Sequence, residues 1–394
     1  SIHFLVLGFV MGMAQGVSIL VSQYFGAKDV NRLKRAVTMS AYINLLVGIG
    51  MSVASVAGSR WMLEWMNTPP EILDMAVVYI QRIFCGILIS LAYNFFSGIL
   101  RALGDARNPL IAMVIAFFIN TILDVVFVMG LDMGVAGAAY ATVLAQGVSA
   151  LYCLVCLRKV EVLRLKAADW RMDGRLLARS FALSLPVALM NAVTAVGVMV
   201  LQAAINGFGA LYVAGYTAAS KIIVILEQIS STFGFATATY VGQNMGAGLP
   251  ERIRAGVWKI NMAVLVMNAF SALVMLLGGR FLLGLMVSSA QQDVVDIAYH
   301  CLVFLSCFLV ALGVLWVVRC SLQAMGDTVF PMLSGFLEFG SRVFFVWLFP
   351  RFFGFDGVLG SEVSAWIGAA VFLGIVFGYR MRYFRHERAI IQEA

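Results

Sequence analysis

Asn120 and Asp124 are the residues of this sequence best placed to do chemistry, because they put an amide and a carboxylate into the apolar stretch 109–130. An ionised Asp in hydrocarbon costs several kcal/mol, so it normally faces a protein interior or a water-filled path. A spacing of four residues places both side chains on one helical face. The pair predicts half of an ion site, at which Asp124 binds Na⁺ or takes up a proton. The alternative is an Asp that reaches the membrane interface, since only about 9 Å of helix follows it.

Glu338, Arg342 and Glu227 are further charged residues inside apolar stretches. Glu338 and Arg342 are four residues apart, so they can pair on one helical face. Two roles stay open for them: a structural pair, or part of a substrate cavity. Glu227 lies deep in another apolar stretch, where it can contact a cationic substrate or hydrogen-bond a neighbouring helix.

The composition indicates an all-α polytopic membrane protein. Hydrophobic residues make up 62% of the chain and charged residues 12%, and the mean hydropathy is +0.95. A soluble core cannot hide that much apolar surface, and open strands cannot cross lipid. Eleven spans are predicted, at about 1–25, 36–58, 76–101, 109–130, 134–157, 180–205, 212–242, 256–279, 297–320, 331–350 and 357–379.

Charge alternates between the two sets of connections. One set carries most of the Lys and Arg, and Arg319 is counted in it, whereas the other carries only Arg60, Arg280 and Arg351. Excess basic charge marks the cytoplasmic side, so the C-terminus is expected inside and residue 1 outside. The net charge of +7 is explained by this topology and by anionic lipid, without nucleic acid.

The chain also repeats itself. Three motifs recur in the same order, which indicates two parallel repeats. We expect an N-terminal lobe at 1–157, a basic cytoplasmic linker at 158–179 and a C-terminal lobe at 180–394. The matches join 21–27 with 241–247, 100–105 with 322–327, and 134–137 with 357–360, at offsets of about 220, 222 and 223.

The second repeat begins with a helix, 180–205, that has no counterpart in the first. We therefore expect a protein of six plus six helices whose first helix is missing from this sequence. A groove is expected in the first lobe in its place.

Four segments of the chain resemble the multidrug and toxic compound extrusion (MATE) family: the run from Gly16 to Ala27 and the three segments given at the end of this paragraph. The resemblance covers nearly the whole chain. It implies two six-helix lobes that export organic, often cationic or amphipathic compounds in exchange for Na⁺ or H⁺. The three segments are 100–105, 134–139 and 241–247.

The resemblance also implies a set of site residues. In the branch with an N-lobe cation site, the polar residues of the fourth, fifth and sixth helices correspond here to Asn94, to Asn120 with Asp124, and to Thr142. The family's Asp on the first helix has no counterpart, so the resemblance implies that the expected groove lies beside Asp124 and that the cation site is too incomplete for normal coupled transport. The stretches 186–200 and 303–318 contain no acids, which favours the N-lobe mechanism over the C-lobe one.

The predicted function is therefore secondary antiport of drug-like small molecules by a monomer in the bacterial inner membrane. The coupling ion is Na⁺ or H⁺, and no cofactor is expected. An enzyme would need clustered acids or a nucleophile with its base, and neither is present. A lipid-linked oligosaccharide flippase is the alternative, but its pyrophosphate would need a basic cavity, for which Arg82, Lys221 and Arg342 are the candidates.

Two further expectations concern structure. Gly8, Gly12 and Gly16 repeat every four residues, which lets a neighbouring helix approach closely. Asp105 and Asp327 each precede a proline that starts a helix, so both are expected to cap helices.

Overall fold

A computed structural model describes residues 2–65, 70–286 and 292–393, and within these ranges helices are joined by short turns and loops, without strands. Eleven helical segments are long and apolar enough to cross a membrane, which confirms the predicted fold class. The chain forms two compact units, residues 1–192 and 193–394. Their boundary falls within one long helix, α7, and the lobe boundaries drawn from the sequence stay a prediction.

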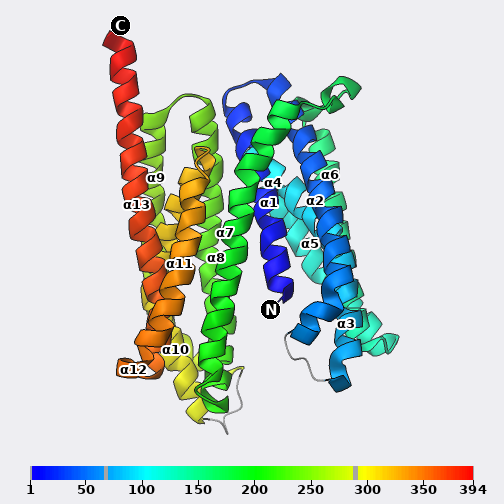
Figure 1. Cartoon of the computed structure of the whole chain (residues 1–394), viewed down its shortest axis with the longest axis vertical. Coiled ribbons are helices and arrows are strands. Elements are labelled where there is room, and N and C mark those ends of the chain that lie inside the picture. The colour runs from blue at the N-terminus through cyan, green and yellow to red at the C-terminus, as the bar shows by residue number, and fades with distance from the viewer. Residues whose placement is uncertain (1, 66–69, 287–291, 394) are drawn as a thin grey trace. The chain divides into compact units, whose positions relative to one another are not determined.

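Unit 1 (residues 1–192) is a bundle in which α6 packs against α4 and α5, and α1 packs against α2 and α4 (Figure 1). Short 3₁₀ turns at Glu161–Leu163 and Ala167–Trp170 fall in the predicted linker. The helices are α1 (Ile2–Gly26), α2 (Val30–Trp65), α3 (Pro70–Cys85), α4 (Ile87–Ala102), α5 (Arg107–Asp124), α6 (Gly134–Lys159) and the first part of α7 (Gly174–Asn206).

Unit 2 (residues 193–394) is built around α10, which packs against α8, α9 and α13, while α11 packs on α13. The end of α7 contributes Leu201 and Ile205 to the large apolar core of this unit. The remaining helices are α8 (Ala210–Gly246), α9 (Pro250–Gly284), α10 (Gln292–Ala324), α11 (Val329–Leu348), α12 (Pro350–Phe353) and α13 (Phe355–Glu393).

Two predicted spans of unit 1 depart from regular α-helix. The span 76–101 is interrupted at Gly86, between α3 and α4. A Cβ on Gly86 would collide with Val143 of α6, so the missing side chain allows the break to sit against that helix. The span 109–130 changes at Asp124 from α-helix to a π-helical turn, Val125–Gly130. Such turns widen a helix and are frequent at functional sites.

The glycines of α1 serve helix packing, as the sequence predicts. A Cβ on Gly12 would lie 2.5 Å from Cα of Ala188, and one on Gly16 would overlap Ser184. Both partners belong to the part of α7 that lies in unit 1. The missing side chains thus allow the two backbones to approach closely.

Backbone geometry favours a different register for the last of the three sequence matches between the repeats. Gly134 has φ +55° and Gly354 has φ +57°, so Gly134 corresponds to Gly354 rather than to Gly357. Ring and hydroxyl contacts support this offset of about 220. Tyr152 of α6 donates a hydrogen bond to Asn108 of α5 at 3.2 Å, and in unit 2 Phe372 of α13 contacts Phe330 of α11.

The two predicted capping residues differ. Asp105 accepts a hydrogen bond from the backbone N–H of Asn108 at 3.0 Å, which confirms a capping role at the start of α5. For Asp327 the prediction is wrong, because its carboxylate instead accepts a hydrogen bond from Nε of Arg380 at 2.8 Å. Arg380 lies on α13, 53 residues away, so tertiary packing supplies a charged partner that outcompetes the local backbone.

Candidate functional site

Helices α4, α5 and α6 carry the four predicted cation-site residues of unit 1. Asn94 lies on α4, Asn120 and Asp124 on α5, and Thr142 on α6. The three helices pack against one another in pairs. The site residues are therefore presented by neighbouring helices of one unit.

Asp124 is the most distinctive of the four. Its side chain is half-buried, and its Oδ1 is buried without a hydrogen-bond partner among the described residues. A buried carboxylate oxygen without a donor is costly. Such an oxygen is also a ready ligand for a cation or an acceptor for a proton. The last residue of α5 therefore fits the chemistry that the sequence predicts for it.

Asn120 and Thr142 are brought together by the packing of α5 on α6. Nδ2 of Asn120 donates to Oγ1 of Thr142 over 3.5 Å, which is a long hydrogen bond. The Thr142 hydroxyl in turn donates to the carbonyl of Ala138 at 3.0 Å. Its proton is thus committed to the helix, which leaves the oxygen lone pairs to face the Asn120 amide or a cation.

Asn94 is held by its own helix and lies beside a polar link that the sequence analysis missed. Its Nδ2 donates to the carbonyl of Ser90 at 2.8 Å. The Ser90 hydroxyl donates to Oε1 of Gln146, which joins α4 to α6. Gln146 lies one helical turn from Thr142, so the α4 and α6 sides of the site are connected through this link.

The helix that carries Asp124 is also the least covered of the predicted spans. Only 6% of the best apolar window in Arg107–Gly130 is buried. Phe117, Phe118 and Ile122 are each at least 60% exposed. Contact with lipid is the ordinary role of such residues in a membrane-spanning helix.

Unit 2 contains a buried network of two arginines and two glutamates. Arg319 of α10 donates to Glu338 of α11 and to the hydroxyl of Ser334 at 3.3 Å. Arg342 of α11 lies 3.7 Å from Glu338, so the pairing predicted from their spacing is confirmed as the weaker of two links. The Arg319 side chain is only 6% exposed, so its assignment to a cytoplasmic connection is wrong.

The strongest link in this network joins α11 to α13. Nε of Arg342 donates to Oε2 of Glu362 at 2.6 Å, and Nη2 donates to Oε1 at 2.8 Å. The Arg342 side chain is 2% exposed and that of Glu362 10%. A bidentate pair of this kind satisfies both carboxylate oxygens and fixes the relative rotation of the two helices.

Glu227 of α8 lies at the edge of this network. It is half-buried and lies close enough to Glu362 and Arg342 for electrostatic interaction with both. A role in binding a cationic substrate stays a prediction for Glu227, as a role in the cavity does for Glu338 and Arg342.

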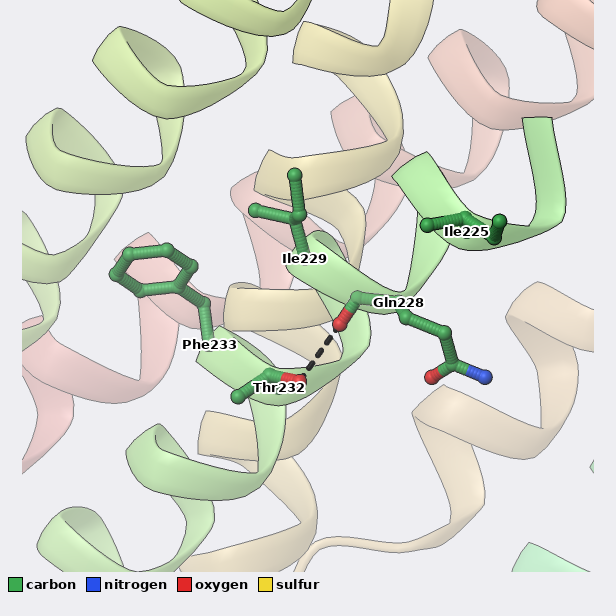
Figure 2. Close-up of a pocket in the computed structure, with 5 residues that line it drawn as sticks. All are labelled: Ile225, Gln228, Ile229, Thr232 and Phe233. Atoms are coloured by element: carbon green, nitrogen blue, oxygen red, sulfur yellow. Dashed lines mark hydrogen bonds between the residues drawn. The ribbon is translucent and has the colours of Figure 1, made fainter. Parts of the chain in front are cut away.

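An open hollow of about 300 Å³ lies on one face of α8, close in sequence to Glu227. Figure 2 shows Phe233 and Ile229 projecting on one side of it and the amide of Gln228 on the other. The Thr232 hydroxyl donates to the carbonyl of Gln228 at 2.7 Å, so it is engaged with the helix. Ile225 completes the lining, which is therefore mostly apolar with one amide group, whose Oε1 accepts a hydrogen bond from the Ser231 hydroxyl at 2.8 Å.

The sequence analysis missed Ser90, Gln146, Arg319 and Glu362. For Glu362 and Arg319 a signal was present, since both are charged residues inside apolar spans. Ser90 and Gln146 are uncharged and carried no comparable signal. Within the described ranges, no group of three or more His, Cys, Asp or Glu side chains could hold a metal ion.

Known proteins match this chain over most of its length. The profile of the MatE family matches residues 1–126 and 186–348. The chain is 30% identical to the probable multidrug resistance protein YpnP of Bacillus subtilis over 366 residues, which cover 91% of this chain and 80% of that protein. It is 22% identical to the multidrug export protein MepA of Staphylococcus saprophyticus, with 91% and 78% coverage.

The fold is shared with solved structures as well. One is an outward-facing multidrug resistance MATE family transporter of the MOP superfamily, with a TM-score of 0.90, 21% identity, and coverage of 97% of this chain and 86% of that one. The eleven membrane-spanning segments, the internal repeat and the match to the family profile over most of the chain agree. The chain belongs to the MATE family of membrane transporters, whose members are not enzymes.

Proposed function

We propose that this chain is a multidrug antiporter that exports amphipathic or cationic organic compounds in exchange for Na⁺ or H⁺, with the coupling site at Asp124. The observation that carries the proposal is the buried Oδ1 of Asp124, which has no hydrogen-bond donor among the described residues. The names of the relatives YpnP and MepA, which refer to multidrug resistance and export, support the class of substrate.

Cation binding at Asp124 would act on the packing of three helices. A Na⁺ ion would recruit the oxygens of Asn120 and Thr142, and a proton would turn Asp124 into a donor for one of them. Either event would replace the long contact between Asn120 and Thr142. The Ser90–Gln146 link would carry the change to α4 and Asn94. Such a change could convert ion binding into alternating access.

The hollow on α8 is the surface we assign to the substrate. Its lining of Ile225, Ile229 and Phe233 suits the apolar part of an amphipathic compound, and Gln228 can accept or donate a hydrogen bond. Glu227 lies one residue away along α8 and would attract a cationic group. The two lobes at 1–157 and 180–394, a cytoplasmic C-terminus, a monomeric state and a bacterial plasma membrane location belong to the same proposal.

The flippase alternative receives no support from the geometry. Of its three candidate bases, Arg342 is buried and ion-paired, and Arg82 lies over the ring of Tyr140 at 5.4 Å. Neither guanidinium is a free ligand for a pyrophosphate. Only Lys221 of the three is exposed, and one exposed amine does not make a basic cavity.

The decisive experiment is dye export from proteoliposomes with imposed gradients of Na⁺ or of pH. The variant is Asp124→Asn, which removes the charge and keeps the shape. Asp132→Asn is the matched control, because Asp132 is exposed and its φ of +52° is well tolerated by Asn. We expect gradient-driven export to be lost in Asp124→Asn and kept in Asp132→Asn. Undiminished export by well-folded Asp124→Asn protein would refute the proposed role.

The two gradients also separate the coupling ions. Export driven by the Na⁺ gradient alone would identify Na⁺, and export driven by the pH gradient alone would identify H⁺. Loss of export under both conditions in the unaltered protein would refute antiport itself.

A further inference from the structure

The ion pair of Arg342 and Glu362 lies at the positions of the second repeat that correspond to Asn120 and Thr142 in the first. Arg342 follows Asn120 by 222 residues and Glu362 follows Thr142 by 220. These are the offsets at which α11 matches α5 and α13 matches α6. In both units, therefore, one side chain of the fifth helix of the repeat bonds one side chain of the sixth.

A second pair of contacts between the same helices supports this register. In unit 1, Asn108 and Tyr152 are joined by a hydrogen bond, and the residues at the same offsets, Phe330 and Phe372, are in ring contact in unit 2. The matched pairs lie 12 residues away along the fifth helix of the repeat and 10 residues away along the sixth. The correspondence between the two sites thus rests on a second pair of contacts between the same helices.

The chemistry of the two places is complementary. Unit 1 presents neutral oxygens and amides there, together with the unpartnered carboxylate of Asp124. In unit 2 the residue that corresponds to Asp124 is Val346, and the carboxylates come instead from Glu362 and Glu338. A cation is already present between them, because Arg342 itself places a guanidinium there.

This guanidinium belongs to a buried cluster of two arginines and two glutamates. Arg319 and Arg342 face Glu338 and Glu362, and all four residues are at most 8% exposed. Glu227 of α8 is a further carboxylate within electrostatic range of Arg342. Nη1 of Arg342 is turned to α7, where a Cβ on Gly197 would lie 2.8 Å from it. Buried carboxylates are stable only when a cation accompanies them, and here the chain supplies it.

We propose that Arg342 is a tethered cation which permanently fills, in unit 2, a cation site built like that of unit 1. The site formed by Glu338, Glu362 and Gly197 is a guanidinium-binding site, and only unit 1 exchanges its ion. The claim that only unit 1 exchanges its ion rests on the proposed function of Asp124, whereas the claim that unit 2 binds a guanidinium concerns binding alone. Removal of the Arg342 side chain should therefore create a site for free guanidinium.

Chemical rescue tests this directly on the full chain in detergent. The melting temperature of Arg342→Ala is measured with increasing guanidinium chloride at sub-denaturing concentrations, and with NaCl or tetramethylammonium chloride at equal ionic strength. We expect Arg342→Ala to melt lower than the unaltered protein and to recover by an amount on the order of a few degrees, saturably, with guanidinium only. Arg280→Ala is the matched control, since its pair with Asp296 is exposed.

Three results would overturn the proposal. They are no recovery with guanidinium, equal recovery of Arg280→Ala, and equal recovery with tetramethylammonium, which cannot donate hydrogen bonds. No transport is measured, so failure here is distinct from failure of the antiport proposal.

A second variant keeps the test decisive if Arg342→Ala does not fold. The double variant Arg342→Ala with Glu362→Gln removes one charge of each sign, and Glu338 keeps its partner Arg319. It is expected to fold and to show no response to guanidinium. If it fails to fold, or if guanidinium stabilises it, the balance of charge is not what holds this site together and the proposal is wrong.

Discussion

Both carboxylate oxygens of Glu362 are held by the guanidinium of Arg342, through Nε at 2.6 Å and Nη2 at 2.8 Å, across the interface of α13 with α11. The link is buried, so water cannot replace either partner. Arg342 and Glu362 are 20 residues apart in the sequence, so their ion pair is a tertiary contact rather than a local one. The stability of unit 2 should therefore depend on this pair more than on any exposed ion pair.

The variant Glu362→Gln should lose about 3–5 kcal/mol of unfolding free energy, because it leaves the Arg342 charge buried without its main partner. Asp296→Asn breaks the exposed pair with Arg280 and should cost no more than about 1 kcal/mol. Thermal or denaturant unfolding in detergent measures both. A similar small loss for the two variants would contradict the importance assigned to burial.

The variant Thr142→Val should raise the cation concentration needed for half-maximal export by roughly 5- to 30-fold, because it removes one neutral oxygen from the proposed site. Thr121→Val is the matched control. Thr121 lies on α5 and donates to the carbonyl of Phe117 at 2.9 Å, just as Thr142 donates within its own helix. An unchanged cation dependence in Thr142→Val would remove this residue from the site.

The variant Gly12→Ala should destabilise unit 1 by about 1–3 kcal/mol, because its new methyl group would overlap the backbone of Ala188. Gly50→Ala offers the comparison, since a Cβ at Gly50 meets no atom within 4 Å. That change should be neutral or stabilising by up to about 1 kcal/mol, given the higher helix propensity of Ala. Melting temperatures of the purified variants distinguish the close helix contact at Gly12 of α1 from the open space at Gly50 of α2.

The variant Ile225→Ala should raise the KM for an amphipathic dye by roughly fivefold, because apolar area in the α8 hollow is lost. Its kcat and its dependence on the coupling ion should stay unchanged. Ile375→Ala on α13 removes the same atoms from a side chain of nearly equal exposure, 69% against 68% for Ile225. If both variants shift KM equally, the hollow is not a specific substrate surface.

Local composition was sufficient to predict the membrane class, the helical spans and Asp124 as a candidate site residue. Apolar runs must form helices to satisfy their backbone in lipid, and a carboxylate within such a run stands out by its cost. The glycine spacing of α1 predicted close packing for the same local reason. The repeat was also visible from spacing alone, although the sequence paired Gly134 with Gly357, whereas Gly354 is the glycine that shares its positive φ.

Pairing between helices was decided only by the tertiary structure. From the sequence, Arg319 was assigned to a basic connection, but in the structure Glu338 of α11 lies beside it. Asp327 was predicted to cap a helix, but in the structure it pairs with Arg380 of α13. The same holds for Glu362, whose partner lies on another helix. A charged residue in a membrane span requires a partner, and this requirement is visible in the sequence. Which residue becomes the partner depends on the rotation and register of neighbouring helices, and these depend on the packing of every side chain between them.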